Sequence, residues 1–173
     1  MHAFVHASVC SRIDYCNSLL IGLPKSRLAP LQSVLNAAAH LIAHILRFSH
    51  ISTFMTENLH WLALSARIHF KIIFLVFKAF LGLAPSYLCK LIMRPLSAIS
   101  NRPLHSLVHN DLLVPRSRTS TSQQCAFASA GPLLWNCLPV KTRAQILSRS
   151  LSSTPRLLKS FLFSGAYRTG GRL

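Results

Sequence analysis

The side chains that most often carry out acid–base and metal-dependent catalysis are scarce in this chain. Its 173 residues include three acids, Asp14, Glu57 and Asp111, and these lie far apart in the sequence. Two-metal phosphoryl transfer requires clustered carboxylates, and glycoside hydrolysis requires a pair of them. The sequence therefore predicts no catalytic residues for these reactions, and we expect a protein that is not an enzyme.

Histidine and cysteine, the other common metal ligands and nucleophiles, show no ligand spacing. His40 and His44 lie four residues apart, as in the helical HExxH zinc motif, but Leu41 stands where that motif needs Glu. A polar helix face explains this pair better than a metal site. The five cysteines form no CxxC pair, so neither a zinc site nor a disulfide framework is indicated. We expect no metal, no cofactor and a reducing compartment, either cytoplasmic or nuclear.

Basic residues dominate the charged side chains. The chain has 19 Lys and Arg, and its formal net charge is +16 at pH 7. Three acids cannot neutralise this charge internally, so a polyanion is the natural partner. Nucleic acid is the leading interpretation and an anionic membrane surface is the second. The alternative is that drift in an unselected copy removed the acids.

The candidate phosphate contacts lie on a helix, around a loop and near the carboxyl end. Three of them are spaced to form a stripe on one helix face, and two lie in a loop introduced by Pro115. Contacts of this kind give affinity without reading the base sequence, although each residue can equally belong to a solvated cationic surface. The predicted nucleic-acid-binding residues are Arg67, Lys71, Lys78, Arg94, Arg102, Arg116, Arg118, Lys141 and Arg143.

Aromatic side chains can add stacking platforms for nucleobases. Tyr15 and Tyr87 are the better-exposed candidates for that role. Trp61 and Trp135 are expected to pack in the core. The same is expected of four phenylalanines at helical spacing, Phe70, Phe74, Phe77 and Phe80.

Two helices are required to position these residues. The first has apolar residues at intervals of three and four, and Pro30 fits its first turn. Its predicted core positions are Leu28, Leu31, Leu35, Ala38, Ile42 and Ile45. The second runs from about Ser65 to Leu81 and is ended by Gly82. Its predicted core positions are Ile68, Ile72, Leu75, Val76 and Ala79.

Shorter elements surround these two helices. An earlier helix is predicted over Ser11–Leu20, and Pro85 is expected to open a short helix through about Leu91. The most apolar window, Ile72–Leu83, contains Lys78 and is too short to span a bilayer, so no transmembrane segment is expected. The first ten residues lack the basic region of a secretory signal.

The second half of the chain is less regular. Residues 94–124 are rich in Pro, Ser, Asn and Thr, which predicts a long linker. Within this stretch Leu112–Val114 could pair with Cys125–Ala128 in one short β-hairpin. Short helices are predicted over Pro132–Leu138 and Pro155–Phe163. The sequence thus predicts a mainly α fold, a small irregular helical domain with a long linker. The predicted regions are a helical region at 1–93, the linker at 94–124 and a carboxy-terminal extension with small helices at 125–173.

Seven short strings occur in one order along the chain. The strings are SRIDYCNSLLIGLP from Ser11, LQSVLNAAAHLI from Leu31, NLHWL from Asn58, RIHFKI from Arg67, FKAFLGLAPSYL from Phe77, LLVPRSR from Leu112 and LLWNCLP from Leu133. Together they resemble the carboxy-terminal part of the polyprotein of LINE-type, non-LTR retrotransposons, downstream of the reverse-transcriptase palm. The resemblance covers about Met1 to Tyr167, and His6–Cys10 is longer than is usual in that family.

The resemblance implies that Ser11–Leu91 corresponds to thumb-side helices that grip a template–primer duplex behind the palm. The expected function is a non-catalytic reverse-transcriptase fragment that binds RNA or DNA electrostatically, with little dependence on sequence. One alternative is an interaction module for a partner protein, a membrane or a second copy of the chain through exposed apolar surface. Another is a translated transposon pseudogene with no selected function.

Overall fold

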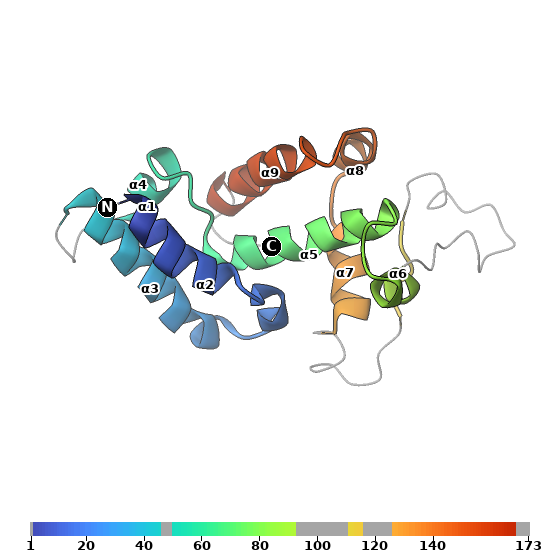
Figure 1. Cartoon of the computed structure of the whole chain (residues 1–173), viewed down its shortest axis with the longest axis horizontal. Helices are drawn as coiled ribbons and strands as arrows, with labels where there is room; N and C mark the ends of the chain where they lie inside the picture. Colours follow the sequence, from blue (N-terminus) through green and yellow to red (C-terminus); the bar gives the residue numbers. More distant parts are fainter. Residues whose placement is uncertain (1, 46–49, 93–110, 116–125, 169–173) are drawn as a thin grey trace, which may run out of the picture. The chain divides into compact units, whose positions relative to one another are not determined.

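The computed structural model describes residues 2–45, 50–92, 111–115 and 126–168, with the side chains of residues 2 and 166–168 excepted. Within these residues the chain is mainly helical, which confirms the predicted fold class (Figure 1). It divides into two compact units. Unit 1 comprises Met1–Ile68 and Lys159–Leu173, and unit 2 comprises His69–Leu158. Most of the predicted linker, residues 94–124, lies outside the described residues.

Unit 1 opens with a helical rod whose register changes part-way along. The rod consists of α1 (His2–Val5), a π-helix (His6–Cys10) and α2 (Ser11–Asp14), and the backbone stays in the right-handed helical region at both junctions. The helix predicted over Ser11–Leu20 is interrupted, because Tyr15 is extended and Cys16 is left-handed, with φ 54°. A 3-10 helix then covers Asn17–Leu20.

Helix α3 (Lys25–Ala43) lies against the first rod and begins earlier than its periodicity indicates. Pro24 acts as its N-cap residue, and the carbonyl oxygen of Pro24 accepts the N–H groups of Arg27 at 2.9 Å and Leu28 at 3.3 Å. Pro30 therefore lies inside the helix, beyond the first turn where the sequence placed it.

The far end of α3 corrects one predicted core residue. Leu35 and Ala38 are buried, as expected. His44 takes a left-handed conformation with φ 52° and ends the helix at Ala43. Ile45 therefore lies past the helix and is 42% exposed, so its assignment to the core was wrong.

Helix α4 (Ser52–Glu57) packs on α3 and buries Met55. After it, the chain reaches Trp61 and Leu62, both buried, and enters α5. The Leu64 N–H donates to Oε1 of Gln32 on α3 at 2.8 Å. This bond satisfies one of the backbone donors that the first turn of a helix leaves without an internal partner.

Helix α5 (Leu64–Phe80) is strongly apolar, and its part from His69 onward belongs to unit 2. Ile68, Ile72, Val76 and Ala79 are buried, which confirms the predicted core face, whereas Leu75 is half-buried. Gly82 adopts a φ of 70°, its N–H donates to Ala79, and the next N–H, from Leu83, donates to Lys78. This is the Schellman ending that a glycine favours.

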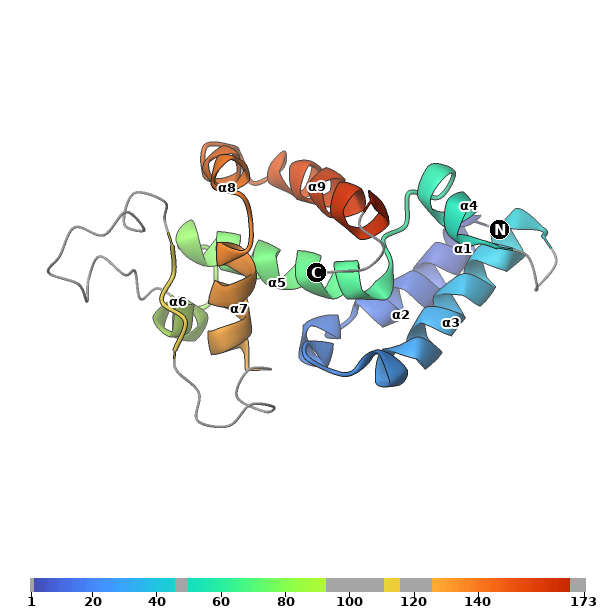
Figure 2. The same ribbon diagram turned by 180° about the vertical axis from the view of Figure 1, so that it is seen from behind.

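In unit 2, α6 (Ser86–Ile92) packs against α7 (Phe127–Asn136), and the two lie side by side in both views (Figures 1 and 2). Gly131 permits a close approach to α5, since a Cβ at that position would lie 3.2 Å from a methyl group of Val76. Trp135 is fully buried, as predicted, and its ring centroid lies 4.9 Å from that of Phe80.

The rest of the chain forms α8 (Val140–Leu147) and α9 (Thr154–Arg168), and α9 is longer than the predicted helix Pro155–Phe163. Helix α7 also begins earlier than the predicted turn at Pro132–Leu138, and Pro132 lies inside it.

The predicted β-hairpin was wrong, because Phe127 and Ala128 of its second strand belong to α7. The side chain of Asn136 forms two hydrogen bonds with the backbone of Leu112. It accepts the Leu112 N–H at 3.0 Å and donates to the Leu112 carbonyl oxygen at 2.8 Å. An amide side chain thus satisfies both backbone groups of a buried residue.

Candidate nucleic-acid interface

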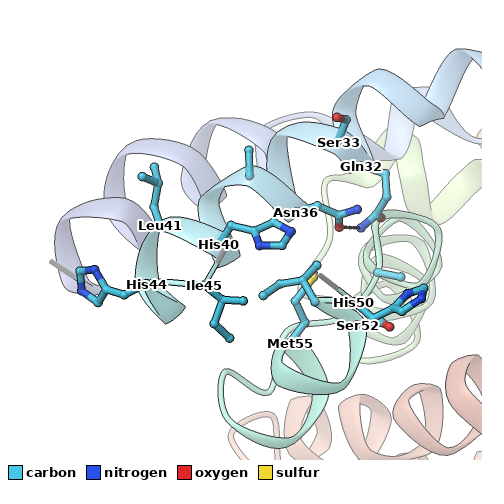
Figure 3. Close-up of a pocket in the computed structure, with 13 residues that line it drawn as sticks. Gln32, Ser33, Asn36, His40, Leu41, His44, Ile45, His50, Ser52 and Met55 are labelled. Atoms are coloured by element: carbon cyan, nitrogen blue, oxygen red, sulfur yellow. Dashed lines mark hydrogen bonds between the residues drawn. The ribbon is translucent and has the colours of Figure 1, made fainter. Parts of the chain in front are cut away.

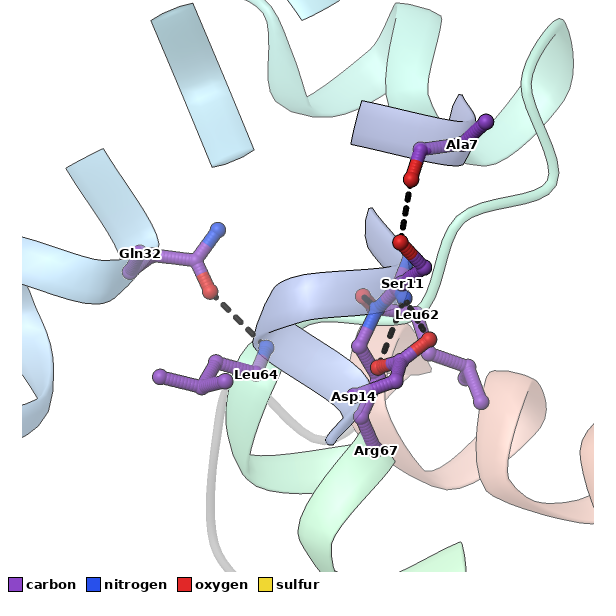
Figure 4. Close-up of polar contacts among 7 residues, drawn as sticks. All are labelled: Ala7, Ser11, Asp14, Gln32, Leu62, Leu64 and Arg67. Carbon is purple, nitrogen blue, oxygen red and sulfur yellow. Dashed lines mark hydrogen bonds and ion pairs between the residues drawn. The ribbon is translucent and has the colours of Figure 1, made fainter. Parts of the chain in front are cut away.

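Arg67, the first residue of the predicted basic stripe, is engaged inside unit 1 (Figure 4). Its Nη1 donates to both carboxylate oxygens of Asp14, at 3.0 and 2.8 Å, and its Nε donates to the carbonyl oxygen of Leu62 at 2.8 Å. The guanidinium carbon also lies 5.8 Å from the centroid of the Trp61 ring. The side chain of Arg67 is 11% exposed, so its charge is committed to the interior of the unit.

The same cluster includes a buried thiol. Cys10 is fully buried. Burial raises the pKa of the Cys10 thiol above its usual value, and the nearby Asp14 charge raises it further, whereas the charge and hydrogen bond of Arg67 act in the opposite direction. Desolvation lowers the pKa of Lys159, and the positive charge of Arg67 adds to this effect. Arg67 therefore influences two titratable groups from separate parts of the sequence.

Arg143 of α8 makes the corresponding ion pair in unit 2. Its Nη1 donates to the carboxylate of Asp111, and the side chain of Arg143 is 5% exposed. The Nε of Arg143 is buried and lacks a hydrogen-bond partner within the described part of the chain. Like Arg67, this residue holds the fold together and does not present its charge to solvent.

The two ion pairs change the interpretation of the net charge. They engage two of the three acids of the sequence, Asp14 and Asp111, with arginines that are themselves nearly buried. The third acid, Glu57, lies exposed at the end of α4. The sequence therefore holds far more lysines and arginines than acidic side chains that could neutralise them, and exposed cations such as Lys71 and Lys141 carry this excess of positive charge on the surface.

Lys71 and Lys141 are the predicted site residues that are exposed in the structure. Lys78 is half-buried, and its Nζ lies 5.0 Å from the centroid of the Phe74 ring, which indicates a cation–π contact. Lys71 and Lys78 are seven residues apart and share one face of α5 within unit 2. Four of the predicted residues lie outside the described residues: Arg94, Arg102, Arg116 and Arg118.

Several exposed cations were not among the predicted site residues. Examples are Arg12 of α2 and Lys25 and Arg27 of α3 in unit 1, and Lys90 of α6 in unit 2. The helical pattern could have identified Lys90, since it lies on the side of α6 opposite the buried Ile92.

The tryptophans and tyrosines divide as the sequence predicts, whereas of the four phenylalanines predicted to pack in the core Phe77 is buried and Phe70, Phe74 and Phe80 are half-buried. Trp61 and Trp135 are 4% and 0% exposed, whereas Tyr15 and Tyr87 are 80% and 63% exposed. The two tyrosines therefore present ring faces to solvent, one in each unit.

A pocket of about 930 Å³ lies in unit 1 between α3 and α4 (Figure 3). Gln32, Asn36 and His40 line its α3 side, and Gln32 Nε2 donates to Asn36 Oδ1 at 2.9 Å. His40 Nδ1 is buried and has no hydrogen-bond partner among the described residues. His44 and His50 also line the pocket, but no three metal-ligating side chains of the described residues gather closely enough to hold an ion.

Comparison with known proteins gives no relative, since no family model, curated protein or solved structure matches this chain. None of the helices in the described residues is long and apolar enough to cross a membrane.

Proposed function

We propose that this chain is a non-catalytic fragment of a LINE-type reverse transcriptase that binds RNA or DNA through phosphate contacts. The observation that carries the proposal is the internal use of the acids. Asp14 and Asp111 pair with the nearly buried Arg67 and Arg143, which leaves Glu57 as the one further acidic side chain of the sequence beside seventeen other lysines and arginines. A phosphate backbone supplies that counter-charge.

The exposed cations suit nonspecific binding. Lys71 and Lys141 are compact charges on long side chains, and Lys contacts phosphate as a point charge without fixed geometry. Contacts of this type position a nucleic acid but do not read its bases. The chain would therefore hold element RNA or target DNA, in the cytoplasm or the nucleus, without selecting a sequence.

The π-helix is consistent with the proposed origin. His6–Cys10 is the segment that exceeds the usual length in the retrotransposon family, and it folds as a π-helix inside an otherwise continuous rod. A π-helix absorbs extra residues without ending a helix. An insertion at this point would therefore leave the neighbouring helices intact.

The double variant Lys71→Met and Lys141→Met tests the proposal. Each lost phosphate contact reduces the slope of log affinity against log salt by about 0.9 on duplex DNA. We expect the two changes together to reduce the slope by about 1.8, while Lys71→Arg with Lys141→Arg keeps it. An unchanged slope in the Met variant would exclude these residues as contacts, and absent binding by the wild type at about 50 mM salt would overturn the proposal.

A second candidate function, an interaction module, is favoured by the exposed apolar residues of α3. Val34 is 47% exposed and Leu41 is 63% exposed, and their spacing of seven residues puts them on one helix face. Sedimentation of the wild type and of Leu41→Glu tests this candidate. A concentration-dependent complex that Leu41→Glu removes would support it, and a monomer at all concentrations would count against self-association.

A further inference from the structure

The solvent-facing side of α6 carries an aromatic ring beside a cation. Tyr87 is 63% exposed and Leu91 is 49% exposed, and Lys90 is exposed between them in the sequence. With about 3.6 residues per turn, these three side chains share one face of α6. Ile92, which is fully buried, lies on the other face.

The ring stands on a fixed scaffold. The Schellman turn at Gly82 sets the direction of the chain into α6, and the Pro85 carbonyl oxygen accepts the N–H of Leu88 at 2.9 Å at the start of that helix. Ile92 anchors the other end in the core, and α6 packs against α7. The position of Tyr87 is therefore set by packing elsewhere in unit 2, and its own exposed ring contributes little to that packing.

The charge of unit 2 decides which partner this face suits. Residues 69–158 contain eleven Lys and Arg and one acid, Asp111, which Arg143 engages. A second copy of the chain would be repelled by this charge, whereas a polyanion would be attracted. Lys90 also interrupts the apolar face, which reduces the area available for insertion into a membrane.

We propose that Tyr87 is a stacking platform for an unpaired nucleobase of single-stranded RNA or DNA, with Lys90 contacting the adjacent phosphate. A tyrosine ring offers a π-face to any base, and a neighbouring cation tracks the backbone, which together give tight but sequence-tolerant binding of single strands. Bases in a duplex are stacked on one another and do not offer a free face to the ring. This inference rests on the proposed nucleic-acid binding and adds a preference for single strands over duplexes.

Fluorescence anisotropy with a single-stranded RNA and with a duplex of matched length tests the platform in the full chain. We expect Tyr87→Leu to weaken single-strand binding by about 5–150-fold, which corresponds to the loss of ~1–3 kcal/mol for one stacked base. Duplex affinity should stay unchanged, and Tyr87→Phe should keep the wild-type affinity for both. Because Tyr87 is largely exposed, neither variant should alter the helical circular dichroism signal.

Phe4→Leu is the matched control. Phe4 is 73% exposed, but no Lys or Arg lies within seven residues of it in the sequence. This variant should therefore leave the affinity for single strands unchanged. The stacking platform would be overturned if Tyr87→Leu lost the same affinity for single strands and for duplex, or lost no affinity for either. Both results would leave the proposed phosphate binding in place. A wild type that binds neither probe at low salt would overturn the proposed function as well. Tyr87-dependent binding to phosphatidylserine vesicles without single-strand binding would replace the platform by a membrane contact.

Discussion

Replacing Arg67 by Met separates the structural role of this residue from the phosphate contact that its position in a basic stripe predicts. The change keeps most of the apolar stem and removes the guanidinium group. In the structure that group bonds to Asp14 and to the Leu62 carbonyl oxygen and lies over the Trp61 ring. We therefore expect unit 1 to lose stability.

The size of the loss follows from the surroundings of each contact. Leu62 is 5% exposed, and leaving a buried carbonyl without its donor costs about 1–3 kcal/mol. The Asp14 side chain is 42% exposed, so water rehydrates it and its ion pair contributes at most about 1 kcal/mol. The contact with Trp61 adds about 0.5–1 kcal/mol. Together these terms predict a decrease of about 1.5–5 kcal/mol in the free energy of unfolding.

Thermal melting followed by far-UV circular dichroism measures this loss, and hydrogen–deuterium exchange locates it. A decrease of that size lowers the melting temperature of a chain of this length by roughly 3–20 °C. Peptides covering α2 and the start of α5 should exchange faster in the variant. Arg12→Met is the control, because Arg12 is exposed on α2 and its loss should change stability by less than about 0.5 kcal/mol.

Binding data give the result that would refute this reasoning. Arg67→Met should keep the wild-type dependence of duplex DNA binding on salt at a temperature where it is folded, since its charge is already engaged by Asp14. A variant with wild-type stability and a reduced salt slope would show that the guanidinium group contacts phosphate instead.

Three further predictions concern unit 2. Arg143→Met should lower the free energy of unfolding by about 3 kcal/mol in urea titrations, because it breaks a largely buried ion pair. Lys141→Met changes an exposed residue and should leave the free energy of unfolding unchanged. Equal effects of the two variants would contradict the structural role of Arg143. Burial lowers the pKa of His69, so the unfolded chain takes up the proton first, and the free energy of unfolding should fall as the pH drops below about 6.5. Urea titrations above and below that pH should show a smaller fall of the free energy of unfolding in His69→Gln than in the wild type. An identical fall in the two proteins would show that His69 does not cause this pH dependence. Gly82→Ala should lower the free energy of unfolding by about 1 kcal/mol in the same assay, because the φ of 70° at Gly82 disfavours a side chain even though the surrounding space is open. An unchanged free energy of unfolding would argue against the left-handed turn.

The elements that the sequence predicts best are those with local signals. Helix α5 follows from the spacing of Ile68, Ile72 and Val76, and its end follows from Gly82, because both patterns act within a few residues. The sequence places the start of α3 too late, because Pro30 fits the first turn of a helix, whereas Pro24 is the N-cap residue in the structure. Proline fits either position, so composition alone does not choose between them.

Contacts between residues far apart in the sequence explain the remaining differences between the predicted and the observed structure. Asp14 and Arg67 are separated by 53 residues, and no local pattern marks them as partners. The side chain of Asn136 bonds to the backbone of Leu112, which lies 24 residues earlier, and an alternating pattern of residues does not indicate such a contact. The basic stripe therefore contained one arginine with a structural role, and only the fold distinguishes it from the exposed Lys71.

The most direct test of the account is a salt titration of the full chain with single-stranded RNA and with two duplex DNAs of unrelated sequence. If six to ten phosphates are contacted, affinity should fall by about 10³–10⁵ between about 50 and 200 mM salt. The two duplexes should bind equally well, because phosphate contacts do not read bases. Weak binding at the lowest salt, or an affinity that salt does not change, would contradict the claim that the exposed cations bind nucleic acid.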